Sequence, residues 1–342
     1  MRIGLLTSGG DCPGLNAVIR GAVLAGERVH NAEFVGFRDG WRGACDGDVV
    51  PLDRHRVRGL SRQGGTILGS SRTNPYEGPN GGAAHILEVL AAHGIDAIVA
   101  IGGEGTLTAA GRLVAEGVPV IGVPKTIDND LAATDYSFGF DTAVSIATEA
   151  IDRIRTTAES HRRCITVEVM GRQAGWIALH SGMASGANAI LVPEQPRSIE
   201  TIAEWATHVV ANGHAPVIVV AEGFRLADME QAHSHKGLDA FHRPRLGGIA
   251  ELLAPLIEER TGIESRATAL GFVQRGGAPS AYDRVLATRY GMAAVDAAID
   301  RDWGSMVALR GTAIVRARIT DAVQELNLVP EQRYAEAALM FG

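Results

Sequence analysis

The chain has 342 residues, of which 46% are hydrophobic and 21% are charged, and its formal net charge is −7. This length exceeds what one hydrophobic core usually serves, so two domains or one large α/β unit are expected in a soluble globular protein. The negative charge argues against non-specific binding to nucleic acid or to an anionic membrane, but it leaves room for an anionic small molecule at a locally basic site. We therefore expect neither a nucleic-acid partner nor a membrane partner.

The three cysteines, Cys12, Cys45 and Cys164, are widely spaced. Their number and spacing fit neither a disulfide framework nor a zinc site, and they suit a reducing compartment. The opening residues MRIGLLTSGG lack the pattern of a signal peptide, and no apolar run approaches the roughly 20 residues that a membrane span needs. A cytoplasmic location is the expectation.

Short strand-like segments alternate with helical patterns over the first 140 residues. Residues 2–7 (RIGLLT) predict a strand, the loop SGGDCPG follows, and residues 15–27 have the apolar spacing of a helix. Later segments of the same two kinds occupy residues 32–40, 85–94, 95–103, 107–117 and 118–126. Strand, loop, helix and strand at this spacing indicate βαβ units and a parallel sheet with helices on both faces.

The same architecture is predicted again in the second half of the chain. A long helix at 142–160 leads into a strand within 162–172, and further strands are expected within 187–194, 214–224 and 267–277, with a helix at 249–262. The polar stretch 225–247 is expected to be a loop or a flexible insertion, and its histidines His233, His235 and His242 are spaced too irregularly to favour a metal site.

We therefore predict an α/β protein of two Rossmann-like, doubly wound lobes, with mostly parallel sheets facing an active-site cleft. One lobe is expected to hold residues 1–140 plus about 274–320, and the other is expected to hold residues 141–273 plus about 321–342.

Three glycine- and acid-rich loops follow predicted strands of the first lobe: SGGDCPG, GGEGT at 102–106 and PKTIDND at 124–130. Ligands of open parallel sheets bind at the carboxyl ends of the strands, where glycines let backbone N–H groups approach phosphate oxygens. Glu104, Asp128 and Asp130 would repel a bare phosphate, but Mg²⁺ held between carboxylates and phosphate oxygens removes the conflict. Since neither a Walker A run nor a G-x-G-x-x-G fingerprint is present, the pattern favours phosphoryl transfer by another type of site. A dehydrogenase would be expected to carry that fingerprint.

Four arginines stand at the ends of predicted strands in the second lobe: Arg163, Arg172, Arg266 and Arg275. A surface ion pair is the commoner role of any one such arginine. Four in these positions, beside glycines, favour capture of a phosphate ester.

Five segments occur in one order along the chain: TSGGDCPGLNAVIRG, GGEGT, PKTIDND, VEVMGR and LGFVQRGG. With these motifs the chain resembles the 6-phosphofructokinase family over at least residues 3–290. The resemblance implies a glycolytic kinase that transfers a phosphoryl group to the 1-hydroxyl of fructose 6-phosphate with Mg²⁺. It also implies a homo-oligomer, dimer or tetramer, in which Arg163 and Arg266 reach a neighbouring active site.

The resemblance implies that the first of the two lobes binds the phosphoryl donor and that the second binds the sugar phosphate. It also implies a role for each matching residue. Asp128 matches the general base, Thr126 would touch the transferring group, and Arg72 would offset its charge, with Arg172 as the fourth catalytic residue. Glu104 and Asp130 would serve Mg²⁺. The donor site would be lined by Gly10, Arg72, Gly103, Glu104, Gly105 and Thr106. The sugar phosphate would be bound by Thr126, Asp128, Asp130, Arg163, Met170, Gly171, Arg172, Glu222, Arg266, Phe272 and Arg275.

The donor depends on Gly105 and Lys125. ATP-using members commonly have glycine at both positions, whereas pyrophosphate-using members tend to have aspartate and lysine. An aspartate at 105 would oppose the α-phosphate of ATP by bulk and like charge. Glycine leaves that room and lysine does not block ATP, so we expect ATP as donor, with pyrophosphate as the alternative.

Two further departures from the family pattern bear on binding. Phe272 stands where many members have a histidine against the sugar 6-phosphate, which favours weaker sugar binding unless another group compensates. It is also the one feature that favours a second alternative, a non-catalytic subunit that senses a phosphosugar. Arg20 is kept but Leu24 replaces the second arginine of the family's effector site, so regulation by a phosphorylated effector is left open.

Overall fold

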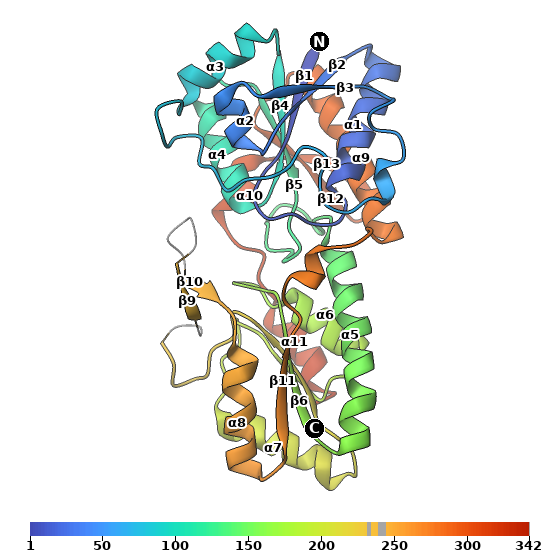
Figure 1. The fold of residues 1–342 in the computed structure, drawn as a ribbon, viewed down its shortest axis with the longest axis vertical. Helices are drawn as coiled ribbons and strands as arrows, with labels where there is room; N and C mark the ends of the chain where they lie inside the picture. Colours follow the sequence, from blue (N-terminus) through green and yellow to red (C-terminus); the bar gives the residue numbers. More distant parts are fainter. Residues whose placement is uncertain (231–233, 239–243, 342) are drawn as a thin grey trace. The chain divides into compact units, whose positions relative to one another are not determined.

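The computed structural model describes residues 1–230, 234–238 and 244–341 (Figure 1). The chain divides into two compact units. The first unit contains residues 1–127, 131–142 and 275–326, and the second contains residues 128–130, 143–274 and 327–342. The predicted α/β class with mostly parallel sheets is confirmed. The assignment of donor and sugar phosphate to separate lobes stays a prediction.

The first unit is built on a seven-stranded sheet in the order β13-β12-β5-β4-β1-β2-β3. Its five inner strands are parallel, and the two edge strands β3 and β13 pair antiparallel with their neighbours. The strands are β1 (Arg2–Thr7), β2 (Glu33–Phe37), β3 (Val49–Leu52), β4 (Ala97–Gly102), β5 (Val120–Pro124), β12 (Ser305–Arg310) and β13 (Ala313–Arg318). The predicted alternation of strand and helix is therefore found, while β3, β12 and β13 are additions that the sequence patterns did not single out.

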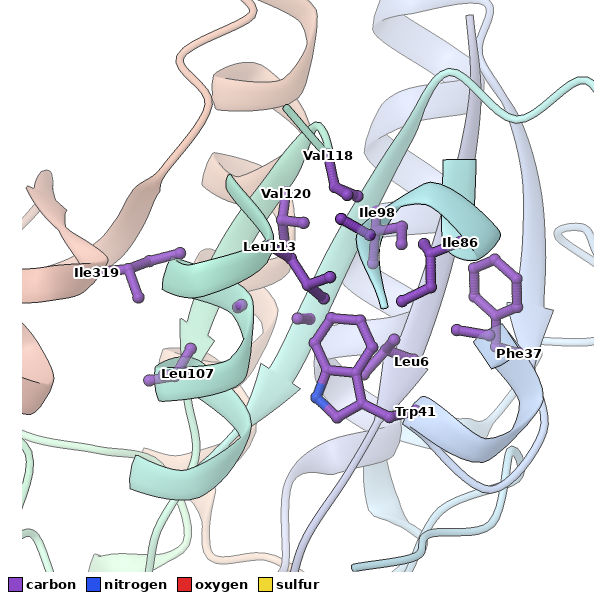
Figure 2. Close-up of a cluster of buried hydrophobic side chains, with 14 of the residues drawn as sticks. Leu6, Phe37, Trp41, Ile86, Ile98, Leu107, Leu113, Val118, Val120 and Ile319 are labelled. Carbon is purple, nitrogen blue, oxygen red and sulfur yellow. The ribbon is translucent and has the colours of Figure 1, made fainter. Parts of the chain in front are cut away.

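Helices cover both faces of this sheet (Figure 1). They are α1 (Leu15–His30), α2 (Trp41–Asp46), α3 (Ala83–Ala92), α4 (Glu104–Ala115), α9 (Ala281–Ile299) and α10 (Ile319–Gln324), with a short 3-10 helix η1 (Leu60–Arg62). Helices α1 and α9 pack closely because glycines face backbone at their crossing: a Cβ on Gly21 would lie 2.5 Å from the Thr288 carbonyl oxygen. The core on the other face joins α2, α3, α4 and α10 to the sheet through buried side chains such as Trp41, Ile86 and Leu113 (Figure 2).

The second unit is built on a parallel four-stranded sheet in the order β11-β6-β8-β7. The strands are β6 (Cys164–Val169), β7 (Ala189–Leu191), β8 (Val217–Ala221) and β11 (Ser265–Ala269). The helices are α5 (Phe140–His161), whose first residues belong to the first unit, α6 (Trp176–Ala184), α7 (Ile199–Ala211), α8 (Ile249–Thr261) and α11 (Glu331–Ala338). Apolar side chains of α7 and α8 bury the strands on one face, among them Ile202, Leu253 and Ile257.

Two expectations are corrected here. The stretch 225–247, predicted to be a loop, contains an antiparallel pair of strands, β9 (Ser234–Leu238) and β10 (Pro244–Leu246). Period-2 alternation is absent from these few residues, which is why the pattern gave no strand signal. His233 and His242 lie outside the described residues. The strand predicted within 267–277 stops at Ala269, and residues Gly271–Arg275 form a 3-10 helix, η2, because Gly271 has a left-handed φ of 54°.

Within the described ranges, every helix is too short or too polar to cross a lipid bilayer.

Candidate active site

The three loops that follow β1, β4 and β5 lie close together. They leave the carboxyl ends of these strands, which are adjacent and parallel, so all three begin at the same end of the sheet. The Ser8 N–H donates to the Ile101 carbonyl at 3.0 Å, and the Lys125 N–H donates to the Gly102 carbonyl at 2.9 Å. Lys125 is only 4% exposed, and its ammonium group donates a hydrogen bond to the Gly10 carbonyl. The loops predicted from the sequence to lie together are therefore hydrogen-bonded to one another.

A fourth segment, which carries Arg72, lies against the same loops. The Gly9 N–H donates to the Ser71 carbonyl at 2.9 Å, and the Ser70 hydroxyl donates to the Gly9 carbonyl at 2.6 Å. Arg72 follows directly and is exposed. The structure thus places the chain at Arg72 next to Gly9 and Gly10, although no strand pattern in the sequence predicts this position.

Helix α4 begins at the same carboxyl end of the sheet, with Gly103 as its N-cap, and no side chain caps its first turn. Glu104 is the first helical residue, Gly105 is exposed, and Thr106 is buried. A Cβ on Gly105 would have no atom within 4 Å, whereas a Cβ on Gly102 would lie 2.3 Å from the Thr106 Cβ. Glycine is thus required by packing at 102, and neither packing nor a left-handed φ requires it at 105.

Arg275, at the end of η2, belongs to the first unit. Its Nη1 donates to the Asp11 carbonyl at 3.2 Å, and a Cβ on Gly10 would lie 3.0 Å from the same nitrogen. The structure thus brings Arg275 to the SGGDCPG loop, where its charge lies beside backbone that is predicted to bind phosphate.

Cys12, in the same loop, is fully buried. Burial raises the pKa of its thiol to about 12, against the lowering effect of the nearby Lys125 charge. Cys12 therefore stays a thiol at neutral pH, and it is not suited to act as a nucleophile.

Asp128 and Asp130 are half-buried and flank Asn129, which has a left-handed φ of 52°. Asn327 holds this segment: its N–H donates to the Asp130 carbonyl at 2.9 Å, and its Nδ2 donates to the Asn129 carbonyl at 2.8 Å. The Asn327 carbonyl in turn accepts from the Trp176 indole N–H at 2.7 Å. Sequence reasoning missed Asn327, because nothing local marks a residue that arrives from 198 positions away.

The segment Met170–Arg172 leaves the carboxyl end of β6 beside Glu222 at the end of β8. The Glu222 N–H donates to the Val169 carbonyl at 2.8 Å, and the Gly223 N–H donates to the Gly171 carbonyl at 3.0 Å. Gly171 has a φ of 136°, and a Cβ on Gly223 would lie 1.9 Å from the Arg172 carbonyl oxygen. The predicted sugar-phosphate residues Met170, Gly171, Arg172 and Glu222 are thus brought together.

Arg163 and Arg266 lie at the opposite end of these strands, where β6 and β11 begin. Both arginines form ion pairs with Glu264, with N–O distances of 2.9 Å from Arg163 and 2.5 Å from Arg266. Arg163 beside Glu264 holds the pKa of that carboxyl below its ordinary value. Because a strand rises about 3.3 Å per residue, Arg163 is roughly 20 Å along the strand from Met170. Within the second unit, the structure therefore does not bring these two arginines to Met170, Arg172 and Glu222 of the same chain.

Phe272 lies on η2 and is 79% exposed, so it is not part of the core of the second unit. Among the described residues, no group of three or more His, Cys, Asp or Glu side chains is placed to hold a metal ion. Glu104 and Asp130 nonetheless offer the hard carboxylate oxygens that Mg²⁺ prefers, so their chemistry fits the predicted ion.

The chain is similar to known proteins over its whole length. A pyrophosphate–fructose 6-phosphate 1-phosphotransferase of Amycolatopsis methanolica is 59% identical, with all of both chains covered. The ATP-dependent 6-phosphofructokinase 3 of Streptomyces coelicolor is 52% identical, over 98% of this chain and 99% of that protein. An ATP-dependent 6-phosphofructokinase of Mycobacterium bovis is 50% identical, with all of both chains covered.

Solved structures agree with this relationship. A phosphofructokinase of Pichia pastoris in the T-state superposes with a TM-score of 0.82 at 31% identity, covering 99% of this chain and 36% of that longer chain. A pyrophosphate-dependent phosphofructokinase of Marinobacter aquaeolei shares the fold, with a TM-score of 0.83 at 24% identity, covering 100% of this chain and 92% of that one. The phosphofructokinase family profile matches residues 2–298. The chain therefore belongs to the phosphofructokinase family, enzymes that act on a sugar phosphate and a phosphoryl donor.

Proposed function

We propose that this phosphofructokinase transfers the terminal phosphoryl group of ATP to the 1-hydroxyl of fructose 6-phosphate, giving fructose 1,6-bisphosphate and ADP. The observation that carries the choice of ATP is the open space at Gly105. A Cβ there meets no atom within 4 Å, and the backbone is not left-handed, so the fold itself gives no reason for glycine. The missing side chain is accounted for if a ligand uses that space.

The expected ligand in that space is the α-phosphate of a nucleotide. An aspartate at 105 would stand in the first turn of α4, and its negative charge would repel that phosphate. Pyrophosphate has no third phosphate and would not meet it. Gly105 therefore favours the larger donor.

Pyrophosphate is the second candidate, and two observations favour it. Three relatives of 57–59% identity are named as pyrophosphate-using enzymes, while those named as ATP-dependent are 50–52% identical. Lys125 is the residue expected in pyrophosphate users. In this chain, however, the Lys125 ammonium group donates to the Gly10 carbonyl, which gives this lysine a role in joining two loops with either donor.

In the proposed reaction, Asp128 takes the proton from the sugar 1-hydroxyl as that oxygen attacks the terminal phosphorus. Asn327 supports this role, because it anchors the backbone on the carboxyl side of Asp128. Arg72, Thr126 and Arg172 offset the charge on the transferring group and orient it. Glu104 and Asp130 would hold Mg²⁺ together with phosphate oxygens, and the ion would neutralise charge on the donor.

On the donor side, we propose that Gly10, Gly103, Glu104, Gly105 and Thr106 line the site around the N-terminus of α4. The hydrogen bonds that join the loops carrying these residues, at the carboxyl ends of β1, β4 and β5, support this proposal. Arg275 lies against Gly10 in the first unit.

We further propose that Arg163 and Arg266 act on the sugar phosphate of a neighbouring subunit in a homo-oligomer. Their position at the amino ends of β6 and β11, opposite the edge that carries Met170 and Arg172, supports this arrangement. Glu264 keeps the two guanidinium groups side by side until a phosphate competes for them.

The test is the initial rate with fructose 6-phosphate and Mg²⁺, measured with ATP and with pyrophosphate at matched concentrations. We expect turnover with ATP in the wild type, and loss of ATP use in Gly105→Asp. Gly105→Ala is the matched control, because it adds the Cβ without the charge and should reduce ATP use much less than Gly105→Asp does. Turnover with pyrophosphate alone in the wild type would refute the argument from Gly105.

The same assay addresses the non-catalytic alternative. Asp128→Ala should abolish turnover while fructose 6-phosphate still binds, because the base contributes chiefly to the transition state. A wild type that binds the sugar phosphate but turns over with neither donor would favour the sensing subunit instead.

A further inference from the structure

Gln274, which lies in the LGFVQRGG motif, is fully buried in the second unit, yet both ends of its amide are hydrogen-bonded. Its Oε1 accepts from the Met170 N–H at 3.2 Å, and its Nε2 donates to the Gly271 carbonyl at 3.0 Å. A buried amide is stable only with such partners, since leaving its polar atoms unpaired is costly. One side chain thus joins the segment after β6 to the segment after β11.

The backbone explains why an amide is needed there. Along the β6–β11 ladder, the Cys164 N–H donates to the Glu264 carbonyl, and the Leu270 N–H donates to the Glu168 carbonyl at 2.9 Å. The same spacing of 100 residues would pair the Met170 N–H with the carbonyl of residue 270. Gly271, with its left-handed φ, turns the chain away into η2 at this step. Gln274 Oε1 takes the place of the next carbonyl in the ladder.

We propose that Gln274 is a positioning residue for sugar-phosphate binding, which fixes the segment Met170–Arg172 against η2. The inference rests on the proposed function, in which the first segment carries Met170, Gly171 and Arg172, while η2 carries Phe272 and ends at Arg275. Groups that bind one phosphate ester from two loops must keep their separation, because a shift of about 1 Å weakens such a site strongly. The Gln274 amide links the two segments beyond the last step of the sheet.

The first test is Gln274→Met, which keeps a similar volume and removes both hydrogen bonds. We expect the KM for fructose 6-phosphate to rise roughly tenfold, since a buried backbone N–H and a carbonyl lose their partner. The KM for the phosphoryl donor should change little. Gln332→Met, an exposed position on α11, is the matched control and should behave like the wild type.

The second test is Gln274→Glu, which has nearly the same shape. As a neutral acid it can accept from Met170 and donate its O–H to the Gly271 carbonyl, whereas as a carboxylate it cannot donate. Burial raises the pKa of such a carboxyl, so both forms should be reached in an ordinary pH range. We expect the ratio of its KM for fructose 6-phosphate to that of the wild type to be near one at pH 6 and to rise by pH 8.5.

Using the ratio removes pH effects that both enzymes share, including titration of the sugar phosphate. The charged residues on the joined segments, Glu168, Arg172 and Arg275, are the same in both enzymes, so the ratio also cancels their influence. If Gln274 served only the overall stability of the unit, the ratio would not change with pH. A pH-independent ratio, or an unchanged KM in Gln274→Met, would overturn the inference.

Hydrogen exchange of the unliganded protein separates this inference from the proposed function. The Met170 amide should exchange faster in Gln274→Met, while the Cys164 amide, earlier on the same strand, should exchange as in the wild type. A wild type that neither binds nor phosphorylates fructose 6-phosphate would refute the proposed function and with it the sugar-phosphate role. Unchanged Met170 exchange in an active enzyme would refute the positioning role alone.

Discussion

Asp283 is fully buried in the first turn of α9, and it ties the start of α5 to that helix. Its Oδ2 accepts from the Thr142 N–H at 2.8 Å and from the Thr142 hydroxyl at 2.5 Å, and the Thr142 hydroxyl oxygen accepts from the Ser280 N–H at 3.0 Å. Burial raises the pKa of Asp283 from 3.8 to about 6, although the hydrogen bonds from Thr142 act in the opposite direction. The fold therefore favours the protonated carboxyl.

The sign of the pH effect follows from this shift. Because the pKa in the folded state lies above the unfolded value, protonation of Asp283 stabilises the fold at low pH, and this contribution is lost as pH rises through about 6. With pKa values of 3.8 unfolded and about 6 folded, the loss between pH 5 and pH 7.5 is about 1.4 kcal/mol.

Asp283→Asn removes the titration while keeping the shape of the side chain. We expect the free energy of unfolding of the wild type to fall by about 1.4 kcal/mol more than that of the variant between pH 5 and pH 7.5. The difference between two pH values is needed because the variant also places an amide NH₂ group in a buried site where the carboxylate accepts hydrogen bonds from Thr142 and Gly139. That cost does not depend on pH.

The assay is urea unfolding followed by circular dichroism at both pH values and equal ionic strength. Asp152→Asn, at an exposed position on α5, controls for the loss of one negative charge. Parallel pH dependence in wild type and Asp283→Asn would show that the buried carboxyl does not titrate in this range and would refute the reasoning.

Three further substitutions test the sugar and base segments. Phe272→His should lower the KM for fructose 6-phosphate, since a hydrogen bond to a charged phosphate is typically worth about 1.5–3 kcal/mol. An unchanged or higher KM would refute the expectation that a histidine here binds the phosphate. Gly223→Ala should destabilise the protein by about 1–3 kcal/mol in urea unfolding and raise the same KM, because its Cβ would lie 1.9 Å from the Arg172 carbonyl oxygen; wild-type unfolding would contradict the crowding. Asn327→Ala should lower kcat more than it changes either KM, because it removes the anchor of the Asp128–Asp130 backbone; an unchanged kcat would argue against that anchor.

The meeting of three loops at the carboxyl end of the first sheet could be predicted from the sequence, because local strand signals and the rule for parallel sheets are sufficient. The apolar runs of β1, β4 and β5 end at glycines, and parallel strands bring their carboxyl ends to one edge. Fold class and the meeting of the three loops follow from these facts. The position of Arg72 could not be predicted in this way, because its segment follows η1 in an irregular stretch. Two hydrogen bonds hold this segment to Gly9: the Gly9 N–H donates to the Ser71 carbonyl, and the Ser70 hydroxyl donates to the Gly9 carbonyl.

The contacts that hold the second unit's loops could not be predicted from local patterns. Asn327 and Gln274 reach their partners from 198 and 104 residues away, and neither residue belongs to a periodic pattern. The place of Arg163 and Arg266 is a different case. Both stand at the amino ends of predicted strands, so their separation from Met170 and Arg172 was implicit in the strand direction.

Glycines show most clearly what a sequence leaves undecided. Gly102, Gly105 and Gly223 each stand at or just after the end of a strand, and the sequence alone does not say which of them the fold requires. A side chain at Gly102 would collide with Thr106, and one at Gly223 would collide with the Arg172 carbonyl, so the fold requires both. Gly105 alone among these three would accept a side chain without any contact in the protein. Its absence is therefore best explained by what binds there, which makes Gly105 the position where a single substitution should change the phosphoryl donor without changing the fold.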